Sequence, residues 1–277
     1  ILVNMKFKGV RIDTDRIERV ESNLRKRENI ALKQIRDKVG FDVEVWAPRS
    51  VEKVFKEVGL KYPRTQEGNP SFPKGFLEKH THEIPKLITH VRELNKARTT
   101  FIQTIKDFTY KGRIHAEIHQ LRDGVSGTVT GRFSYSKPNL QQFPTRSEVI
   151  GNTIRCLFLP EEGKKWGSFD FSQQEPRILV HYASISGLEG SQEAVRMYKD
   201  ADVDFHQMMA DMAGIDRKSA KTINLGIMYG MGQQKLADSL GLELDAAKDL
   251  LNQYHERVPF LKNLYNKASS RAGSDKS

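Results

Sequence analysis

One short stretch constrains the fold of this chain more than any other. Residues 166–169 read as an apolar strand that ends on Asp170, and a helical pattern with Ile178 and Leu179 follows almost at once. Pro176 is tolerated there because the first turn of a helix makes no internal use of its backbone N–H groups. A carboxylate at the end of a strand can reach a metal-bound phosphate. The stretch therefore predicts a strand and a helix joined at Asp170.

A second helix, predicted over residues 217–229, has a face that changes from cationic to aromatic. Arg217, Lys221, Leu225 and Tyr229 recur every four residues. At about 100° per residue, each step drifts by only about 40°, so the four side chains share one stripe. The phosphates of a nucleoside triphosphate would meet the two cations near the helix N-terminus, and its base would lie against the apolar end. The alternative is an ordinary amphipathic helix with a basic end.

The first 40 residues predict a strand and one long helix. Residues 9–12 form the strand, and Asp13, Thr14 or Asp15 caps the helix, which Gly40 closes. Apolar residues at helical spacing define the buried face of this helix: Ile17, Val20, Leu24, Ala31 and Ile35.

The next 70 residues predict two further helices and a loop between them. Ser50 caps a short helix that ends near residue 60, and clustered prolines and glycines make residues 63–75 an irregular, mobile loop. A long helix over residues 84–110 carries Arg92 and Lys96 on a basic flank. Its apolar stripe is formed by Leu87, Val91, Leu94, Ile102 and Ile105.

Alternation over residues 113–119 predicts a strand, and a polar loop follows over residues 128–144. The loop contains Arg132, Asn139 and Gln141, which are all strong hydrogen-bonding side chains. Taken alone, these residues fit an ordinary surface loop equally well.

Charge favours an anionic partner. The 277 residues carry a net charge of +10, which suits an extended polyanion better than an acidic protein. The single cysteine, Cys156, excludes an internal disulfide framework and is predicted to lie in the core. No membrane span or signal peptide is visible in the sequence, so we expect the protein to be located in the cytoplasm of a bacterium or of a phage-infected host.

Three motifs together resemble the family A, or Pol I-like, DNA polymerases. Thr-Gly-Arg-x-Ser at 130–134 precedes Pro-Asn-Leu-Gln at 138–141, Asp-Phe-Ser-Gln-Gln-Glu-Pro-Arg lies at 170–177, and Arg-x-x-x-Lys-x-x-Asn-x-Gly-x-x-Tyr-Gly lies at 217–230. The resemblance covers nearly the whole chain, and the second motif is more similar to phage enzymes than to bacterial ones.

This resemblance implies an α+β fold, mostly helical, with the right-hand architecture of thumb, incomplete antiparallel palm and fingers. It divides the chain into a palm entry strand and long helix (1–40), a thumb (41–111), a partial palm (112–190) and fingers (191–277).

The resemblance also assigns roles around a deoxynucleoside triphosphate. Asp170 is similar to the first metal-binding aspartate of the family, and the carbonyl of Phe171 supplies a second oxygen to two Mg²⁺ ions. Lys221 matches the triphosphate lysine and acid of pyrophosphate release, and the remaining nucleotide-binding positions are Arg217, Leu225, Tyr229, His206, Glu175 and Gln173. Glu175 crowds the 2′ position of the sugar and favours deoxyribose.

For primer–template DNA, the resemblance implies contacts through Arg132, Asn139 and Gln141 near the growing end. The basic flank of the helix over 84–110, with Arg92 and Lys96, would grip the duplex by its phosphates.

Three departures from the family pattern affect these expectations. Phe171 stands where the family usually has tyrosine, and Leu225 stands where it has an aromatic residue. No His-Asp-Glu turn, whose aspartate is the second metal ligand, follows Tyr229. We therefore expect little or no activity from this chain alone and a C-terminal fragment or second chain as its partner.

Two other functions remain open on the sequence. A non-catalytic module that binds primer–template DNA or nucleotides needs the same cations but no chemistry. A single-subunit RNA polymerase would have the same arrangement of catalytic residues in its palm, although Glu175 argues against this function.

Overall fold

The computed structural model describes residues 1–124, 126–145, 147–200 and 204–274. The chain divides into two compact units, Ile1–Gly167 and Ser168–Ser277. This boundary falls inside the range 112–190 that we predict as palm, and the four domain ranges stay predictions. Each unit is described by itself below.

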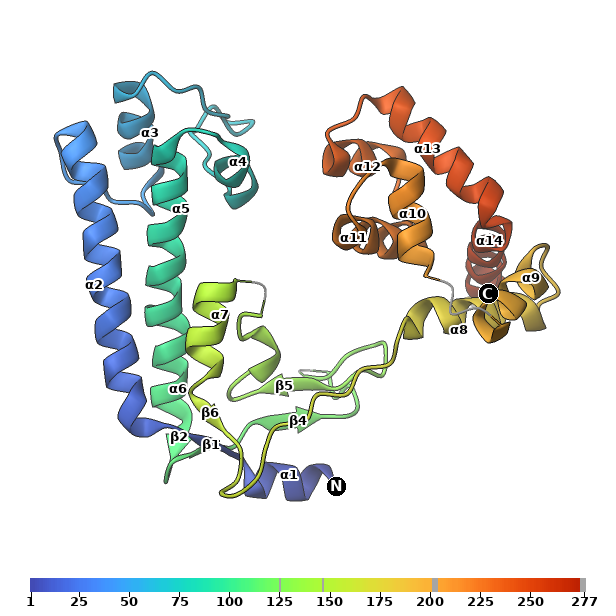
Figure 1. Cartoon of the computed structure of the whole chain (residues 1–277), viewed down its shortest axis with the longest axis horizontal. Coiled ribbons are helices and arrows are strands. Elements are labelled where there is room, and N and C mark those ends of the chain that lie inside the picture. Colours follow the sequence, from blue (N-terminus) through green and yellow to red (C-terminus); the bar gives the residue numbers. More distant parts are fainter. Residues whose placement is uncertain (125, 146, 201–203, 275–277) are drawn as a thin grey trace. The chain divides into compact units, whose positions relative to one another are not determined.

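Two helical columns lie side by side in the first unit (Figure 1). Helix α2 (Thr14–Val39) is one column, and α5 (Glu83–Lys96), the π-helical segment η1 (Ala97–Ile102) and α6 (Gln103–Phe108) form the other. Asp13 caps α2 by accepting a hydrogen bond from the Arg16 N–H, and Gly40 ends it in a left-handed conformation. The predicted caps of this helix are therefore confirmed. The apolar stripes of the two columns meet in two hydrophobic clusters, one around Leu24 and Leu94 and the other around Ile35 and Ile88.

Three shorter helices of this unit are α1 (Leu2–Lys8), α3 (Pro48–Glu57) and α4 (Lys74–Lys79). The prediction that Ser50 caps α3 is wrong. The helix begins at Pro48, whose ring already holds the backbone angle of a first helical residue, and the hydroxyl of Ser50 instead accepts a hydrogen bond from the Glu44 N–H.

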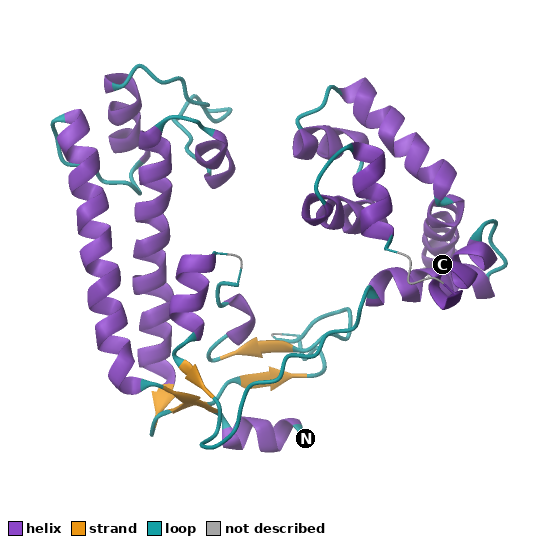
Figure 2. Cartoon of the chain, viewed as in Figure 1, coloured by secondary structure: helices purple, strands orange, loops and turns teal. Residues whose placement is uncertain are grey.

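A four-stranded antiparallel sheet has the order β2-β3-β1-β6 (Figure 2, orange). Its strands are β1 (Val10–Ile12), β2 (Thr109–Tyr110), β3 (Arg113–Ile114) and β6 (Phe158–Leu159). In the register, Val10 lies opposite Ile114 and Arg11 opposite Leu159. The sheet therefore joins the beginning, middle and end of the first unit.

A separate two-stranded sheet pairs β4 (Glu117–His119) with β5 (Ser134–Ser136). The prediction of one strand over 113–119 is wrong because β3 pairs with β1 and β2, whereas β4 pairs with β5. The predicted loop over 128–144 also contains β5 and the short 3-10 helix η2 (Leu140–Gln142). Helix α7 (Glu148–Arg155) follows.

The second unit contains helices and no strand among its described residues. Its elements are α8 (Gln174–Ile185), α9 (Ser191–Asp200), α10 (Phe205–Ala213), α11 (Arg217–Met228), α12 (Gln233–Leu240), α13 (Leu244–Arg257) and α14 (Pro259–Ser274). They enclose one core, which includes the fully buried Tyr254, Met209 and Leu236. Asp202 and Val203, which precede α10 in the sequence, lie outside the described residues.

The predicted strand before Asp170 is absent from the described structure. Residues 164–171 form neither helix nor strand, and Trp166, Phe169 and Phe171 are 63%, 97% and 78% exposed. A strand needs a neighbour to satisfy its backbone N–H and C=O groups, and no strand pairs with this segment in the described part of the chain. Cys156 is also exposed rather than buried, because it lies at the C-terminal end of α7.

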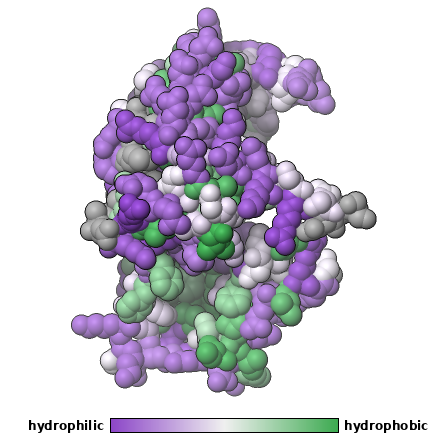
Figure 3. All heavy atoms as spheres, turned by 90° about the vertical axis from the view of Figure 1, so that its right-hand side faces the viewer, coloured by the Kyte–Doolittle hydropathy of each residue, from purple (hydrophilic) through white to green (hydrophobic). Residues whose placement is uncertain are grey.

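Hydrophilic side chains cover most of the face seen in Figure 3, and hydrophobic side chains gather in one region of it. Among the helices that the structure describes, none has both the length and the apolar character to cross a membrane.

Candidate functional site

A pocket of about 360 Å³ in the second unit collects the residues that the sequence predicts for a nucleotide. It lies between the segment that leads into α8 and the N-terminal turns of α10 and α11. The lining residues are Asp170, Phe171, Ser172, Gln173, Gln174, Glu175, Pro176, His206, Arg217, Lys221 and Leu225. Of the predicted nucleotide and metal positions, Tyr229 alone is not a lining residue. Its hydroxyl donates a hydrogen bond of 2.8 Å to Glu175 Oε1, which connects it to the pocket.

A tight turn at Gln173 precedes α8, whose first residues line the pocket. Gln173 has a left-handed backbone conformation (φ 52°), and α8 begins immediately after it. The guanidinium of Arg177 holds this turn by donating to the Ser172 carbonyl at 3.0 Å, and it also lies 4.7 Å from the centre of the Tyr198 ring. These contacts give Arg177 a structural role in the turn.

One wall of the pocket is cationic. Arg217 donates from Nε to Asp204 Oδ2 at 2.6 Å, and its Nη2 lies 2.5 Å from the same oxygen. Burial opposes ionisation of Asp204, but hydrogen bonds from Arg217 and from the backbone of Gln207 and His206 lower the pKa of this carboxyl overall. Lys221 has no ion-pair partner among the residues that the structure describes. This wall therefore offers one paired and one unpaired cation to an anionic ligand.

His206 lines the pocket yet is only 3% exposed. Burial lowers the pKa of His206, Asp204 opposes this effect, and Lys221 and Arg217 reinforce it, so the surroundings favour the neutral imidazole. Nδ1 of His206 lies 3.2 Å from Nδ2 of Asn224. Asn224 in turn accepts a hydrogen bond from the Tyr254 hydroxyl. Neither Asn224 nor Tyr254 is among the site residues predicted from the sequence. Asn224 stands inside the third motif, whereas Tyr254 has only the signature of a core aromatic residue.

The acidic side of the pocket fits part of a magnesium site. Asp170 and Phe171 line the pocket, and the Asp170 carboxylate and the Phe171 carbonyl would provide two oxygens to Mg²⁺, which takes its other ligands readily from substrate phosphates and water. Glu175 is already engaged by Tyr229. No cluster of three or more histidine, cysteine, aspartate or glutamate side chains is found in the described part of the chain. These residues suit one ion and leave a second without protein ligands.

The predicted DNA contacts all lie in the first unit. Asn139 caps η2 by accepting from the Gln141 N–H, and the Gln141 side chain donates to the Phe133 carbonyl at 3.1 Å. The Arg132 carbonyl accepts from the Thr128 hydroxyl. These bonds bring the loop with Arg132 against η2.

Arg92 and Lys96 differ in their surroundings. Arg92 donates to the carbonyls of Val45 and Phe72, both at 2.8 Å, and lies over the Trp46 ring. Burial also lowers its pKa. Lys96 is exposed. We therefore assign Arg92 a structural role and keep Lys96 as the proposed phosphate contact of this helix.

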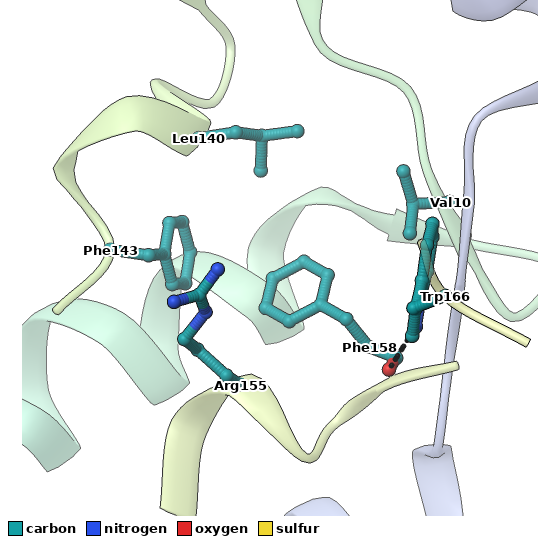
Figure 4. A pocket seen from close by; sticks show the side chains of 6 residues that line it. All are labelled: Val10, Leu140, Phe143, Arg155, Phe158 and Trp166. Carbon is teal, nitrogen blue, oxygen red and sulfur yellow. Dashed lines mark hydrogen bonds between the residues drawn. The ribbon is translucent and has the colours of Figure 1, made fainter. Parts of the chain in front are cut away.

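A second pocket, of about 400 Å³, lies in the first unit and was not anticipated from the sequence. Figure 4 shows the rings of Phe143, Phe158 and Trp166 beside it, with the guanidinium of Arg155 near Phe143. Trp166 donates from Nε1 to the Phe158 carbonyl at 3.3 Å. The pocket is mainly apolar and carries none of the predicted site residues.

Comparisons with known proteins agree on one family. A sequence model of the family described as "DNA polymerase family A" matches residues 14–276. A DNA-directed DNA polymerase of Pseudomonas phage M6 is 42% identical over 260 residues, which cover 87% of this chain and 39% of the phage protein. DNA polymerase DpoZ of Acinetobacter phage SH-Ab 15497 is 32% identical over 302 residues (96% and 47%). The thermostable DNA polymerase I of Thermus filiformis is 31% identical over 274 residues (94% and 32%).

A solved structure shares the fold. The polymerase domain of Pol1 from M. smegmatis, in complex with DNA primer-template and dNTP, superposes with a TM-score of 0.79. At 24% identity it covers 99% of this chain and 49% of its own. The predicted fold class, α+β and mostly helical, is thereby confirmed. The chain spans less than half the length of each of these relatives.

Proposed function

Because the chain belongs to DNA polymerase family A, we propose that it carries the nucleotide-binding part of an enzyme that extends a DNA primer on a template. The observation that carries this proposal is the pocket in which Asp170 shares a lining with Arg217, Lys221 and His206. An acidic group and several donors for phosphate then act on one ligand, a deoxynucleoside triphosphate.

The cationic wall binds the triphosphate. Asp216 caps α11 by accepting from the backbone N–H groups of Lys218 and Ser219, which leaves the first turn of the helix ordered beside the pocket. Lys221 meets the phosphates directly, while Arg217 reaches them by sharing its guanidinium with Asp204. Lys221 also supplies the proton that leaves with pyrophosphate.

The sugar and base meet the opposite end of the same face. The Tyr229 hydroxyl fixes the Glu175 carboxylate, and this carboxylate crowds the position of a ribose 2′-hydroxyl. Leu225 offers an apolar surface to the base but no aromatic ring. Deoxynucleotides are therefore preferred over ribonucleotides.

Magnesium is the proposed cofactor. When bound, it would make the attacking hydroxyl easier to deprotonate and would neutralise charge on the phosphates. Asp170 and the Phe171 carbonyl would hold one ion together with phosphate oxygens. A two-ion site needs further ligands, and we propose that a C-terminal fragment or second chain supplies them.

The first unit grips primer–template DNA. Arg132, Asn139 and Gln141 lie on one folded loop and hydrogen-bond to bases near the growing end, and Lys96 contacts a phosphate. With these assignments, residues 41–111 act as the thumb, 112–190 as the palm and 191–277 as the fingers.

Nucleotide binding tests the core of this proposal. Titrating the chain with dATP and Mg²⁺ should give saturable binding, and Lys221→Ala should weaken it at least about tenfold because a charge-assisted hydrogen bond is lost. Lys248→Ala is the matched control, since this exposed lysine lies on α13 away from the pocket. Equal affinities of the two variants would contradict the assignment.

Primer extension tests the chemistry. The chain alone should extend a primer weakly or not at all, and adding a polypeptide with the family's C-terminal metal-binding turn should restore extension. If the primer is still not extended, although DNA and dATP bind, the result would instead favour a non-catalytic binding module. Extension with ribonucleotides would favour an RNA polymerase.

A further inference from the structure

A buried row of hydrogen bonds connects three helices behind the pocket. The Tyr254 hydroxyl, on α13, donates to Asn224 Oδ1 at 2.5 Å. Nδ2 of Asn224, on α11, lies 3.2 Å from Nδ1 of His206, on α10. Tyr254 and Asn224 are 0% exposed and His206 is 3% exposed. Water therefore does not compete for these bonds.

The order of donors determines where the imidazole proton sits. The amide oxygen of Asn224 is occupied by the Tyr254 hydrogen, so the NH₂ group of the amide is turned toward His206. A ring nitrogen that faces an N–H donor must accept with its lone pair. Nδ1 of His206 is therefore unprotonated, and in the neutral ring the hydrogen is on Nε2.

This tautomer suits a phosphate ligand. His206 shares the pocket lining with Arg217 and Lys221, and Nε2 has no hydrogen-bond partner within the described ranges. Phosphate oxygens at neutral pH only accept hydrogen bonds, so a neutral histidine helps to bind them only if its free nitrogen carries a hydrogen.

We propose that Asn224 and Tyr254 are positioning residues that hold His206 as the Nε2–H tautomer, ready to donate to a triphosphate oxygen. The inference deepens the proposed function and rests on it. Neither residue touches the ligand; both act through His206. The competing explanation is a polar network that only ties α10, α11 and α13 together.

The tautomer can be read directly by nuclear magnetic resonance. We would label the histidines of the chain with ¹⁵N, record long-range ¹H–¹⁵N correlations at pH 7, and assign His206 by its loss in His206→Gln. The expected pattern is a protonated Nε2 and an unprotonated Nδ1. Tyr254→Phe, which keeps the ring, should produce a mixture of tautomers. Tyr265→Phe, which changes an exposed tyrosine of the same unit, should leave the pattern intact.

A carboxylate at position 224 should reverse the arrangement. Asn224→Asp is expected to place a proton on Nδ1 and to raise the pKa of His206, because an aspartate only accepts hydrogen bonds and stabilises an imidazolium. A His206 ring that stays neutral in this variant, with its hydrogen still on Nε2, would contradict the proposed order of donors and acceptors.

Binding of inorganic tripolyphosphate tests the role in ligand recognition. Tyr254→Phe should weaken binding about three- to tenfold, the range expected for one misplaced hydrogen bond. In the His206→Gln background the same change should have no further effect, because its only route to the ligand is lost. Thermal unfolding of each variant confirms that the chain is folded.

The outcomes separate this inference from the function beneath it. If wild-type His206 carries its hydrogen on Nδ1, or if Tyr254→Phe weakens binding equally with and without His206, the inference is wrong while nucleotide binding stands. If the wild-type chain binds neither tripolyphosphate nor dATP with Mg²⁺, the proposed function itself fails.

Discussion

Glu28 is a buried charge that ties the two long helical columns of the first unit together. Its carboxylate accepts from Asn95 at 2.7 Å and from Arg98 at 3.1 Å, and its side chain is almost fully covered. Glu28→Gln should lower the free energy of unfolding by about 1.5–3 kcal/mol, because the charge-assisted bond to Arg98 is lost. Urea unfolding measures this. Glu57→Gln, at an exposed position of α3, should change it by less than about 0.5 kcal/mol, and similar costs for both would contradict the assignment.

Three histidines make stability depend on pH. Burial lowers the pKa of His90, His206 and His255, so each takes up a proton more readily in the unfolded chain. Their contribution is complete above the unfolded value of about 6.5 and is lost as the pH falls below it. Unfolding free energy measured from pH 7.5 to 5.5 should therefore decrease. His90→Gln should reduce the slope, and an unchanged slope would show that His90 does not contribute.

At the same scale, short motifs predicted the pocket well. Asp170, Glu175, Arg217 and Lys221 all line one cavity, and their roles in it stay predictions. That they lie together could be predicted because a site for a phosphate ligand would restrict residue type and spacing together. Tyr254 was missed because its position on an amphipathic helix is typical of any core aromatic residue. Only the tertiary structure reveals its hydroxyl bond to Asn224.

At the scale of elements, η1 behaves as a one-residue insertion in a long helix. The buried positions Leu94 and Ala97 are followed by Ile102 and Ile105, so one step of the stripe is five residues instead of three or four. A π-helical turn absorbs the extra residue and keeps both ends of the stripe on the core. The sequence predicted one continuous helix because the stripe remains apolar on both sides.

Deleting Thr100 should convert this turn to regular α-helix and preserve burial on both sides. We expect the free energy of unfolding to stay within about 1 kcal/mol of the parent, as measured by urea unfolding followed by circular dichroism. Deleting Thr89, in the regular part of α5, should rotate the stripe by about 100° and cost several times more. Equal losses in the two deletions would contradict the insertion.

Strands were the least predictable elements, for a physical reason. Helices such as α2 can be predicted from the local spacing of apolar residues and from their caps, whereas a strand forms only if another segment pairs with it. The alternation over 113–119 was real, yet it divides between two sheets, and the apolar run before Asp170 has no pairing strand in the described structure.

On the scale of the whole molecule, the exposed segment between the units should be cut early by proteases. Lys164 and Lys165 lie outside any helix or strand and are exposed. Limited trypsin digestion should cleave after one of them before it cleaves within α2, which mass spectrometry of the fragments would reveal. Replacing both with glutamine should delay this cut. First cleavage inside α2 would contradict the expected order.

The family could be recognised from the sequence, whereas the boundary between the two compact units at Gly167 is a finding of the structure alone. Motifs place residues relative to chemistry, whereas a boundary such as that at Gly167 depends on which side chains share a core. One core contains Ile12 and Leu157, and another contains Val180 and Leu261, so each is built from segments far apart in the sequence. No local sequence pattern encodes such contacts.

The pocket is lined by two kinds of backbone, capped helices and an extended segment without a pairing strand in the described structure. Lys221 and His206 stand on helices whose first turns are capped and whose inner faces are buried, so their geometric tolerance is narrow. Asp170 stands on extended chain that lacks lateral support in the described structure. If the proposed function holds, fixing the Asp170 segment in place should therefore change the rate of the chemical step more than the affinity for the nucleotide.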